Sequence, residues 1–472
     1  MYNNRATVGH EAEALMRKSA LVKLCAICWN TYCYLAGEKQ MHPFSENIRI
    51  FASRAGQSPA HEHVNSQNGM DKQALLGEIK AMAAAQNAEV IEWRRWLHRH
   101  PELSQEEYGT MAFVAERLAT MGLKPRTGIG RTGVMAMLRG GVEPDSYCVA
   151  LRADYDALPL TECTGLPFAS ENEGVMHACG HDMHTSSLLG AASILCRLRD
   201  RLRGSIMFIF EPSEEKYPGG ARMMMDDGLF AEVTPNEIYS FHCLPEMDYG
   251  RVGMKKGKYM ASTDELYWTV RGRGGHGATP HLSIDPIVIA SHIVVSLQQI
   301  VSRNAPPMMP TVLSFGSIVG QGRTNIIPDE VKMEGIIRTF DEKWRLEAHE
   351  KIRRISCGVA EAMGGGCDLF IDYGYPYVVN DDACTQQVHD NACDFVGEDH
   401  VEWLDLRMTA EDFAFFAQKI PACYFRIGIH EPGTPFSNLH RPNLIVDERS
   451  IELASGLVAY NAVMALENRI KA

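Results

Sequence analysis

The sequence lacks an excess of basic residues. Lysine and arginine number 46 against 59 aspartates and glutamates, which gives a formal net charge of −13. A nucleic-acid-binding protein needs a basic face that neutralises phosphates, and a protein held at a membrane surface carries clustered lysines and arginines. We therefore expect neither nucleic acid nor a membrane as a partner.

The chain also lacks a disulfide framework and a clear membrane span. Its 13 cysteines are odd in number and follow no repeating spacing, which favours reduced thiols and a cytoplasmic location. Residues 21–36 are moderately apolar, but Lys23, Asn30 and Thr31 interrupt them, so this segment is too short and too polar to cross a bilayer. The glycine run at 364–366 lacks the Lys-Ser/Thr of a phosphate-binding loop.

The length of 472 residues suggests two domains or one large one. The stretch from His42 to Met70 is polar and has no helical or strand period, as in a disordered segment. We expect residues 1–69 to be a disordered extension, or a segment that lies upstream of the natural translation start at Met70. Periodic sequence begins near Met70 and continues to the end.

Continuous apolar runs alternate with amphipathic helical patterns over most of the chain. The apolar runs are residues 146–151, 204–210, 237–243 and 422–429. Such runs are typical of strands that are covered on both faces, and residues 184–202 show a helical stripe of apolar side chains. We predict an α/β domain with a largely parallel sheet, formed by residues 70–260 and 378–472.

The pattern changes between residues 261 and 377. Two helical segments here, residues 285–303 and 342–366, are separated by strands of alternating character. The order strand-helix-strand-strand-helix-strand is the split βαβ arrangement. We predict an inserted α+β domain at 261–377.

Metal-binding residue types collect after the predicted strands. These residues are Asp154, Asp156, Glu211, Glu214, Glu215, His242, His430 and His440, and the cluster "HACGHDMH" (177–184) lies between two of the strands. In open α/β sheets, ligands bind beyond the carboxyl ends of the strands. A site built from Cys, His and Glu suits Zn²⁺, Mn²⁺, Ni²⁺ or Co²⁺. No C-x-x-C lies near the cluster, so a closed structural zinc site is disfavoured, and adjacent glutamates allow one to hold a metal while the other moves a proton.

Seven motifs together carry a resemblance to a known family. They are "RRWLHRHPELSQEE" (94–107), "LRADYDALPL" (151–160), "HACGHDMHTSSLLGAA" (177–192), "EPSEEKYPGGARMM" (211–224), "GRGGHGATPHLSIDPI" (272–287), "GRTNIIPDEVKMEGIIRTF" (322–340) and "MTAEDFAFF" (408–416). The sequence resembles the M20 family of metal-dependent amidohydrolases and peptidases. It is most similar to the branch of indole-acetyl-amino-acid hydrolases, hippurate hydrolases and N-acyl-amino-acid amidohydrolases.

The resemblance implies a catalytic α/β domain with an inserted lid that often dimerises, and two divalent metal ions per subunit. The implied metal ligands are Cys179, His181, Glu215, His242 and His440. Glu214 would be the general base toward a metal-activated water, and Asp154 would orient the site. His276 would stabilise the oxyanion across the dimer, and Asn325 and Arg338 would contact the substrate.

Other readings of single residues stay open. His177 and His184 are expected to support the ligands rather than bind metal, and His98 is expected to be structural. Asp182 could orient a ligand or cap the helix that begins there, and Asp156 could be a turn residue. Cys243, Arg441 and the stretch 375–381 depart from the family pattern or border the site, and they leave the substrate open.

The sequence thus predicts a metallo-amidohydrolase that cleaves the amide bond of N-acyl amino acids. A carboxypeptidase or dipeptidase of the same family is the alternative, and removal of an aromatic amine is a third. A non-catalytic binding protein is disfavoured because the base and all ligands are present, and a zinc base deaminase because its H-x-E and P-C-x-x-C motifs are missing. The acyl group, the amino acid and the native metal, zinc or manganese foremost, are not specified.

Overall fold

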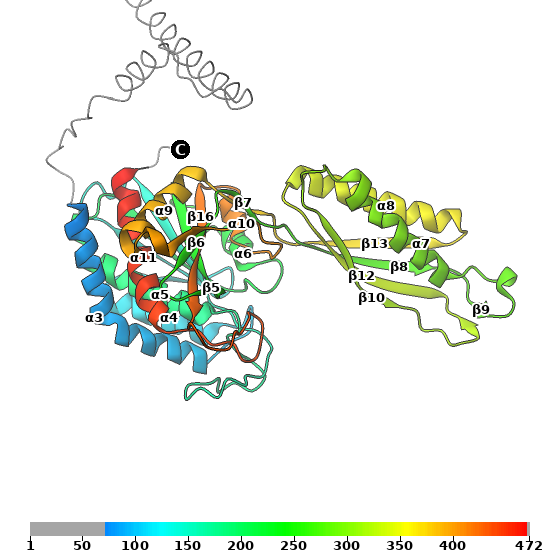
Figure 1. Cartoon of the computed structure of the whole chain (residues 1–472), viewed down its shortest axis with the longest axis horizontal. Helices are drawn as coiled ribbons and strands as arrows, with labels where there is room; N and C mark the ends of the chain where they lie inside the picture. The colour runs from blue at the N-terminus through cyan, green and yellow to red at the C-terminus, as the bar shows by residue number, and fades with distance from the viewer. Residues whose placement is uncertain (1–70, 470–472) are drawn as a thin grey trace, which may run out of the picture. The chain divides into compact units, whose positions relative to one another are not determined.

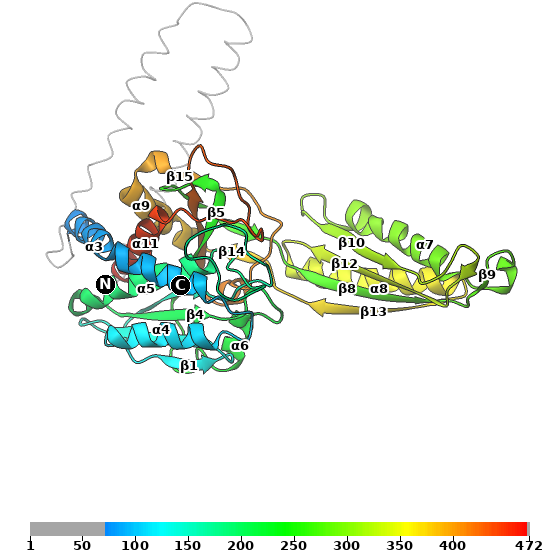
Figure 2. The same ribbon diagram turned by 90° about the horizontal axis from the view of Figure 1, so that it is seen from below.

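The structure is a computed structural model, and it describes residues 71–469. The expectation for residues 1–69 therefore lies outside the described residues. The described chain folds into a larger α/β domain and a smaller inserted domain, which are drawn apart in Figures 1 and 2. The larger domain holds the start and the end of the described chain.

In the described part of the chain, the larger domain contains one eight-stranded sheet. In spatial order its strands are β1 (Arg126–Ile129), β2 (Gly133–Arg139), β4 (Ser205–Glu211), β3 (Cys148–Asp154), β5 (Glu237–Asp248), β16 (Ala422–His430), β6 (Val252–Met254) and β15 (Val401–Trp403). The central strands β4, β3, β5 and β16 run parallel. Antiparallel pairs occur toward the edges, between β1 and β2, β2 and β4, and β16 and β6. The predicted largely parallel sheet is confirmed.

Helices cover both faces of this sheet. The helices that share one buried core with it are α3 (Lys72–Arg99), α4 (Tyr108–Thr120), α5 (His181–Arg197), α9 (Asp382–Val396) and α11 (Arg449–Asn468). The opposite face carries the short helices α6 (Gly220–Asp226) and α10 (Ala414–Ala417), and two 3-10 turns, η1 (Arg199–Arg201) and η4 (Glu398–His400), lie in connections. Asp71 and Asp381 begin α3 and α9, because each carboxylate accepts hydrogen bonds from the first free backbone N–H groups.

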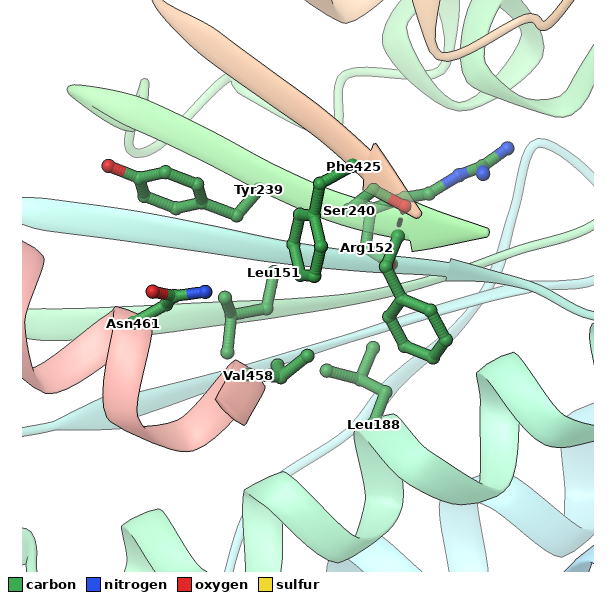
Figure 3. Close-up of a pocket in the computed structure, with 9 residues that line it drawn as sticks. Leu151, Arg152, Leu188, Tyr239, Ser240, Phe425, Val458 and Asn461 are labelled. Atoms are coloured by element: carbon green, nitrogen blue, oxygen red, sulfur yellow. Dashed lines mark hydrogen bonds between the residues drawn. The ribbon is translucent and has the colours of Figure 1, made fainter. Parts of the chain in front are cut away.

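The core between the sheet and the helices leaves a small void (Figure 3). Its volume is about 10 Å³, and Leu151, Leu188, Phe425 and Val458 are among its lining residues. This is about the room that one water molecule needs. The void is therefore too small for a substrate.

The inserted domain has a four-stranded antiparallel sheet in the order β10 (Val312–Val319), β12 (Glu330–Arg338), β8 (Asp264–Arg271) and β13 (Gly366–Tyr373). Its helices are α7 (Pro286–Gln299), continued by the π-helical η3 (Ile300–Asn304), and α8 (Glu342–Ala362). Both helices share one core with the sheet, and Figure 1 shows them together. The chain order β8-α7-β10-β12-α8-β13 matches the predicted split βαβ arrangement.

Short elements complete the inserted domain and its junction. A small ribbon pairs β9 (Gly275–His276) with β11 (Ile326–Ile327) and is followed by η2 (Pro280–Leu282). At the junction, β7 (Gly257–Met260) pairs with β14 (Val378–Asn380). Among the described residues, Pro286–Asn304 is the one helix long and apolar enough to cross a membrane by length and composition. Its side chains Ile289, Ile293 and Leu297 belong to the core of the inserted domain, as in the core helix of a folded domain.

Candidate active site

The predicted metal-binding side chains meet at the carboxyl end of the central strands. The ligand atoms of Cys179, His181 and His242 lie within 4.8 Å of one another, and so do those of Cys179, Glu215 and His440. Cys179 Sγ is 3.3 Å from His242 Nε2. Segments that are distant in the sequence thus converge on one cluster, with Cys179 common to both groups.

Two imidazoles of the cluster are oriented by their second ring nitrogen. His181 Nδ1 lies 3.0 Å from the Asp156 carbonyl oxygen, and His242 Nδ1 lies 2.7 Å from the Cys243 carbonyl oxygen. A carbonyl oxygen accepts only, so each Nδ1 must carry a proton, and in the neutral imidazole Nε2 then has the free lone pair. This arrangement is typical of histidines that bind a metal.

The loops that carry the remaining candidates are held in uncommon conformations. Ser213, just before the two glutamates, and His440 have φ values of 58° and 57°, in the left-handed region that is unfavourable for both residue types. Glu107 fixes the first loop by accepting a hydrogen bond of 2.9 Å from the Ser213 backbone N–H. The His440 backbone N–H donates to the Ala178 carbonyl oxygen at 2.7 Å, so His440 is tied to the segment that carries Cys179.

Glu214 lies beside the cluster in a position suited to a proton carrier. Its carboxylate atoms lie within 4.8 Å of ligand atoms of His181 and Glu215, and the residue is 7% exposed. Burial, followed by the negative charges of Glu411 and Glu215, raises the pKa of Glu214 well above its usual value. The backbone of Glu214 is fixed by Tyr375, whose hydroxyl donates to its carbonyl oxygen at 2.6 Å.

The donor set fits divalent metal ions. His181 Nε2 is a buried atom without a hydrogen-bond partner, and the buried Glu215 Oε1 lies 3.1 Å from His440 Nε2. Buried polar atoms normally have partners, and His181 lies among other ligand-type residues. Thiolate, imidazole and carboxylate donors together suit zinc and its neighbours.

Asp154 and His184 support the cluster from behind. Asp154 accepts from His184 Nδ1 at 2.6 Å, and His184 Nε2 accepts from the Cys243 backbone N–H at 2.9 Å. Both ring nitrogens of His184 are therefore occupied, so it cannot bind a metal without losing a bond. Asp154 also pairs with Arg152 at 2.6 Å.

Asp156 and Asp182 have definite partners. Asp156 contacts His181 Nδ1 at 3.2 Å and accepts from the Glu215 backbone N–H at 3.0 Å, so it is more than a turn residue. Asp182 pairs with Arg94 at 2.7 Å and with His98 at 2.8 Å. The N-cap of the helix is Gly180, which has no side-chain hydrogen bond, so the capping option for Asp182 is wrong.

Burial lowers the pKa of the neighbouring His177 to about 4.

A cleft of about 660 Å³ opens beside the cluster, a volume in the usual range of small-molecule sites. Its lining includes Cys179, Glu214, Glu215, His242, His440, Tyr217, Tyr375, Arg338, Arg407, Glu411 and Arg426. Arg338 comes from the root of the inserted domain, and its Nη1 donates to the Met408 carbonyl oxygen at 3.2 Å. Burial lowers the pKa of Arg338.

His276 and Asn325 do not line this cleft. They lie together on the ribbon of β9 and β11, where the Gly277 backbone N–H donates to the Asn325 carbonyl oxygen at 2.9 Å, and both residues are exposed. Arg441, next to His440, is exposed and does not line the cleft either. The structure thus brings most of the predicted site residues together and leaves His276 and Asn325 apart from them.

Two arginines of the site region were not among the sequence candidates. Arg152 is buried and pairs with Asp154, Glu211, Glu411 and Asp412. Arg426 is 3% exposed and lines the cleft. Its signal in the sequence is an arginine inside the otherwise apolar run "ACYFRIGI", which requires an explanation because arginine is rarely buried without a partner.

Comparisons with known proteins agree with this geometry. The model of peptidase family M20/M25/M40 matches residues 150–462. The chain belongs to this family.

This M20 chain is similar to relatives of more than one kind. It is 43% identical over 305 residues to an N-acyl-L-amino acid amidohydrolase of Geobacillus stearothermophilus, covering 65% of this chain and 81% of the relative. It is 37% identical over 371 residues to thermostable carboxypeptidase 1 of Saccharolobus solfataricus, covering 78% and 92%. A solved structure from Bacillus subtilis, described as a dinuclear metal-binding peptidase of the M20 family, matches with a TM-score of 0.70 and 33% identity, covering 81% and 99%. The M20 chain is therefore a hydrolase of amide bonds.

Proposed function

We propose that the protein is a metal-dependent amidohydrolase that cleaves N-acyl amino acids, with an aliphatic or aromatic acyl group. The observation that carries the proposal is the convergence of five ligand-type side chains and Glu214 on one cluster beside the cleft. The similarity to an N-acyl-L-amino acid amidohydrolase supports this substrate class.

Cys179, His181, Glu215, His242 and His440 would hold two divalent ions, zinc or manganese in the first place and nickel or cobalt in the second. When bound, such ions lower the pKa of a water molecule from about 16 to roughly 7. The similarity to a dinuclear metal-binding peptidase supports the number of ions.

Glu214 serves as the general base in this proposal. Its raised pKa suits a group that takes a proton from the attacking water and later gives it to the leaving amine. Asp154 holds His184 and Arg152 in place behind the ligands. Arg338 offers the cleft a guanidinium without an ion pair among the described residues, which suits the carboxylate of the amino acid.

We also propose a homodimer formed through the lid. Apolar side chains are exposed along one edge of the lid: Ile318 and Val319 on the edge strand β10, and Val295 on α7, which is 72% exposed. An unpaired edge strand beside apolar surface favours association. A second subunit could bring His276 and Asn325, which lie outside their own cleft, to the partner's site. A cytoplasmic location is supported by the free thiols of all described cysteines.

A carboxypeptidase is the second candidate, favoured by the similarity to thermostable carboxypeptidase 1. The test is a substrate screen on protein reconstituted with zinc or manganese, with metal content measured alongside. N-acetyl amino acids, hippurate, indole-acetyl conjugates and dipeptides separate the two candidates. Turnover of dipeptides alone would replace the proposed activity by the carboxypeptidase, and no turnover of any amide by the metal-loaded protein would overturn both.

A further inference from the structure

Arg426 stands beside the metal-ligand cluster. On β16 it lies directly opposite the candidate ligand His242 of β5. Its neighbours Phe425 and Ile427 belong to the core beneath the helices. Since side chains alternate along a strand, Arg426 points to the other side of the sheet, where it lines the cleft.

The Arg426 guanidinium is held in place without being neutralised. Its Nε donates to the Tyr259 hydroxyl at 3.0 Å, and its Nη2 lies 3.1 Å from the Met260 sulfur. The rings of Tyr259 and Tyr424 have their centres 5.6 and 5.0 Å from the guanidinium carbon. Aromatic rings attract a cation weakly and leave its charge in place. Among residues 71–469, no carboxylate lies within 4.0 Å of this guanidinium.

The acidic groups of the same region are already committed. Glu411, which also lines the cleft, accepts a hydrogen bond from the Tyr424 hydroxyl and lies 3.0 Å from Arg152. Asp412 also pairs with Arg152, at 2.9 Å. A buried charge without a partner is costly, so the position of Arg426 favours an anion that enters through the cleft.

The other two arginines of the cleft differ from Arg426 in their partners. Arg407 forms an ion pair of 3.2 Å with Glu246 and has little need of a further anion. Arg338 is assigned to the carboxylate of the amino acid in the proposed function. Lys216 also lines the cleft, but it is exposed to solvent. Arg426 is therefore the buried cation of the cleft that a substrate with a single carboxylate leaves without a partner.

We propose that Arg426 binds a second carboxylate of the substrate, so that the enzyme prefers amides that carry two carboxylates. This inference rests on the proposed function, because it names the substrate class of that same site. The second carboxylate belongs either to the amino acid, as in N-acetylglutamate, or to the acyl group, as in N-succinylalanine. In both cases the guanidinium can bind it through two parallel hydrogen bonds.

Two matched pairs of substrates test the preference on metal-loaded enzyme. The first pair is N-acetylglutamate and N-acetylglutamine, and the second is N-succinylalanine and its neutral succinamyl counterpart. A charged hydrogen bond inside a cleft is worth about 10- to 100-fold in kcat/KM. We expect the acid to be preferred by that factor in one pair, and the pair concerned identifies which half of the substrate carries the second carboxylate.

The variants isolate Arg426 from the rest of the cleft. Arg426→Met should abolish the acid preference while the neutral member of the pair is still cleaved, and Arg426→Lys should keep part of it because the charge remains without the fork. Arg407→Met is the matched control, and it should keep the wild-type ratio. If Arg426→Met does not fold, the wild-type ratios and Arg426→Lys still decide the question.

A binding measurement separates this inference from the proposed function. Calorimetry with metal-loaded Glu214→Gln protein gives the affinity for N-acetylglutamate, N-succinylalanine and their neutral counterparts without turnover. Tighter binding of one acid, lost in Glu214→Gln/Arg426→Met, supports the role of Arg426 even if no N-acyl amino acid is hydrolysed. Equal binding and turnover of acid and amide in both pairs, or an equal loss for all substrates in Arg426→Met, overturns the inference and leaves the amidohydrolase standing.

Discussion

Two buried clusters lie side by side in the catalytic domain, and they balance their charges in different ways. Around Arg152, the carboxylates of Asp154, Glu211, Glu411 and Asp412 all lie within 3.0 Å of one guanidinium. In the ligand cluster, by contrast, Glu214 and Glu215 face a thiol and imidazoles, and no lysine or arginine pairs with them among the described residues. Asp154 links the two clusters, because it contacts both Arg152 and His184.

This difference in charge balance indicates which cluster is structural and which one is suited to bind a ligand. The Arg152 cluster is held together by a cation of the chain itself. The ligand cluster keeps the buried atom His181 Nε2 without a hydrogen bond, and the pKa of Glu214 is raised. A divalent ion would supply to the ligand cluster the positive charge that Arg152 supplies to its own carboxylates.

The largest effect is expected from Glu214→Gln. The amide keeps the shape of the side chain but cannot take a proton, so kcat/KM should fall by about 10²- to 10⁴-fold. Metal content, measured by atomic emission, should stay at the wild-type level because the five proposed ligands remain. Glu246→Gln is a control outside the cluster, and its activity should change little. Full activity of Glu214→Gln would show that this carboxylate is not the base.

Arg152→Met is expected to have the next largest effect. Removing the guanidinium leaves four buried carboxylates facing one another, and breaking a buried ion pair costs about 3–5 kcal/mol of unfolding free energy. Urea denaturation measures this loss. Arg139→Met is the matched control, since Arg139 pairs with Asp145 at the surface with 60% of its side chain exposed, and it should change stability by less than about 0.5 kcal/mol. Equal stability of both variants would contradict the structural role of Arg152.

More of the fold than of the difference between the two clusters could be predicted from the sequence. Continuous apolar runs located the four central strands, and polar residues after them located the edge of the sheet where the ligand-type side chains converge. The partners of Arg152 could not be predicted in the same way. Asp412 is 260 positions away in the sequence, and only the folded chain brings the two together.

The position of Arg426 in the cleft could not be predicted from the sequence either, because the sequence does not show which strands pair or in which register. A strand pattern predicts which residues share a face, but it does not say which strand lies alongside. Only the pairing of β16 with β5 places Arg426 opposite His242. His276 and Asn325 illustrate the opposite limit, because their motifs marked them as site residues although they lie outside the cleft of their own chain.

Metal removal should have a moderate effect on stability, limited to the ligand cluster. An ion that binds only the folded chain stabilises it by about 2.7 kcal/mol at a concentration of 100 Kd, so a chelator should lower the Tm and added zinc or manganese should restore it. Cys179→Ala should weaken this response. Cys148→Ala removes another buried thiol, on β3, and should leave it intact. A Tm that does not respond to chelator or metal would show that the cluster needs no cation.

An effect confined to one pH window is expected at Glu237, a buried carboxylate that has neither an arginine nor a metal-ligand set beside it. It accepts a hydrogen bond from the Tyr239 hydroxyl at 2.6 Å, and burial raises its pKa from 4.5 to about 7. The unfolded chain therefore releases this proton first as the pH rises. Stability should fall between about pH 4.5 and pH 7 and then stay level, with a total loss on the order of 3 kcal/mol.

Glu237→Gln tests this sign. The free energy of unfolding of the variant should lack this fall with pH. The stability difference between Glu237→Gln and wild type should therefore shift in favour of the variant from pH 5 to pH 7 and stay the same from pH 7 to pH 8. Urea denaturation at each pH measures it. Glu232→Gln, at an exposed position, should follow the wild-type curve. Parallel curves for Glu237→Gln and wild type would show that this carboxylate has the same pKa in the folded and the unfolded chain. A buried carboxylate would then stay ionised at this position without a cation, whereas the carboxylates around Arg152 are expected to need one.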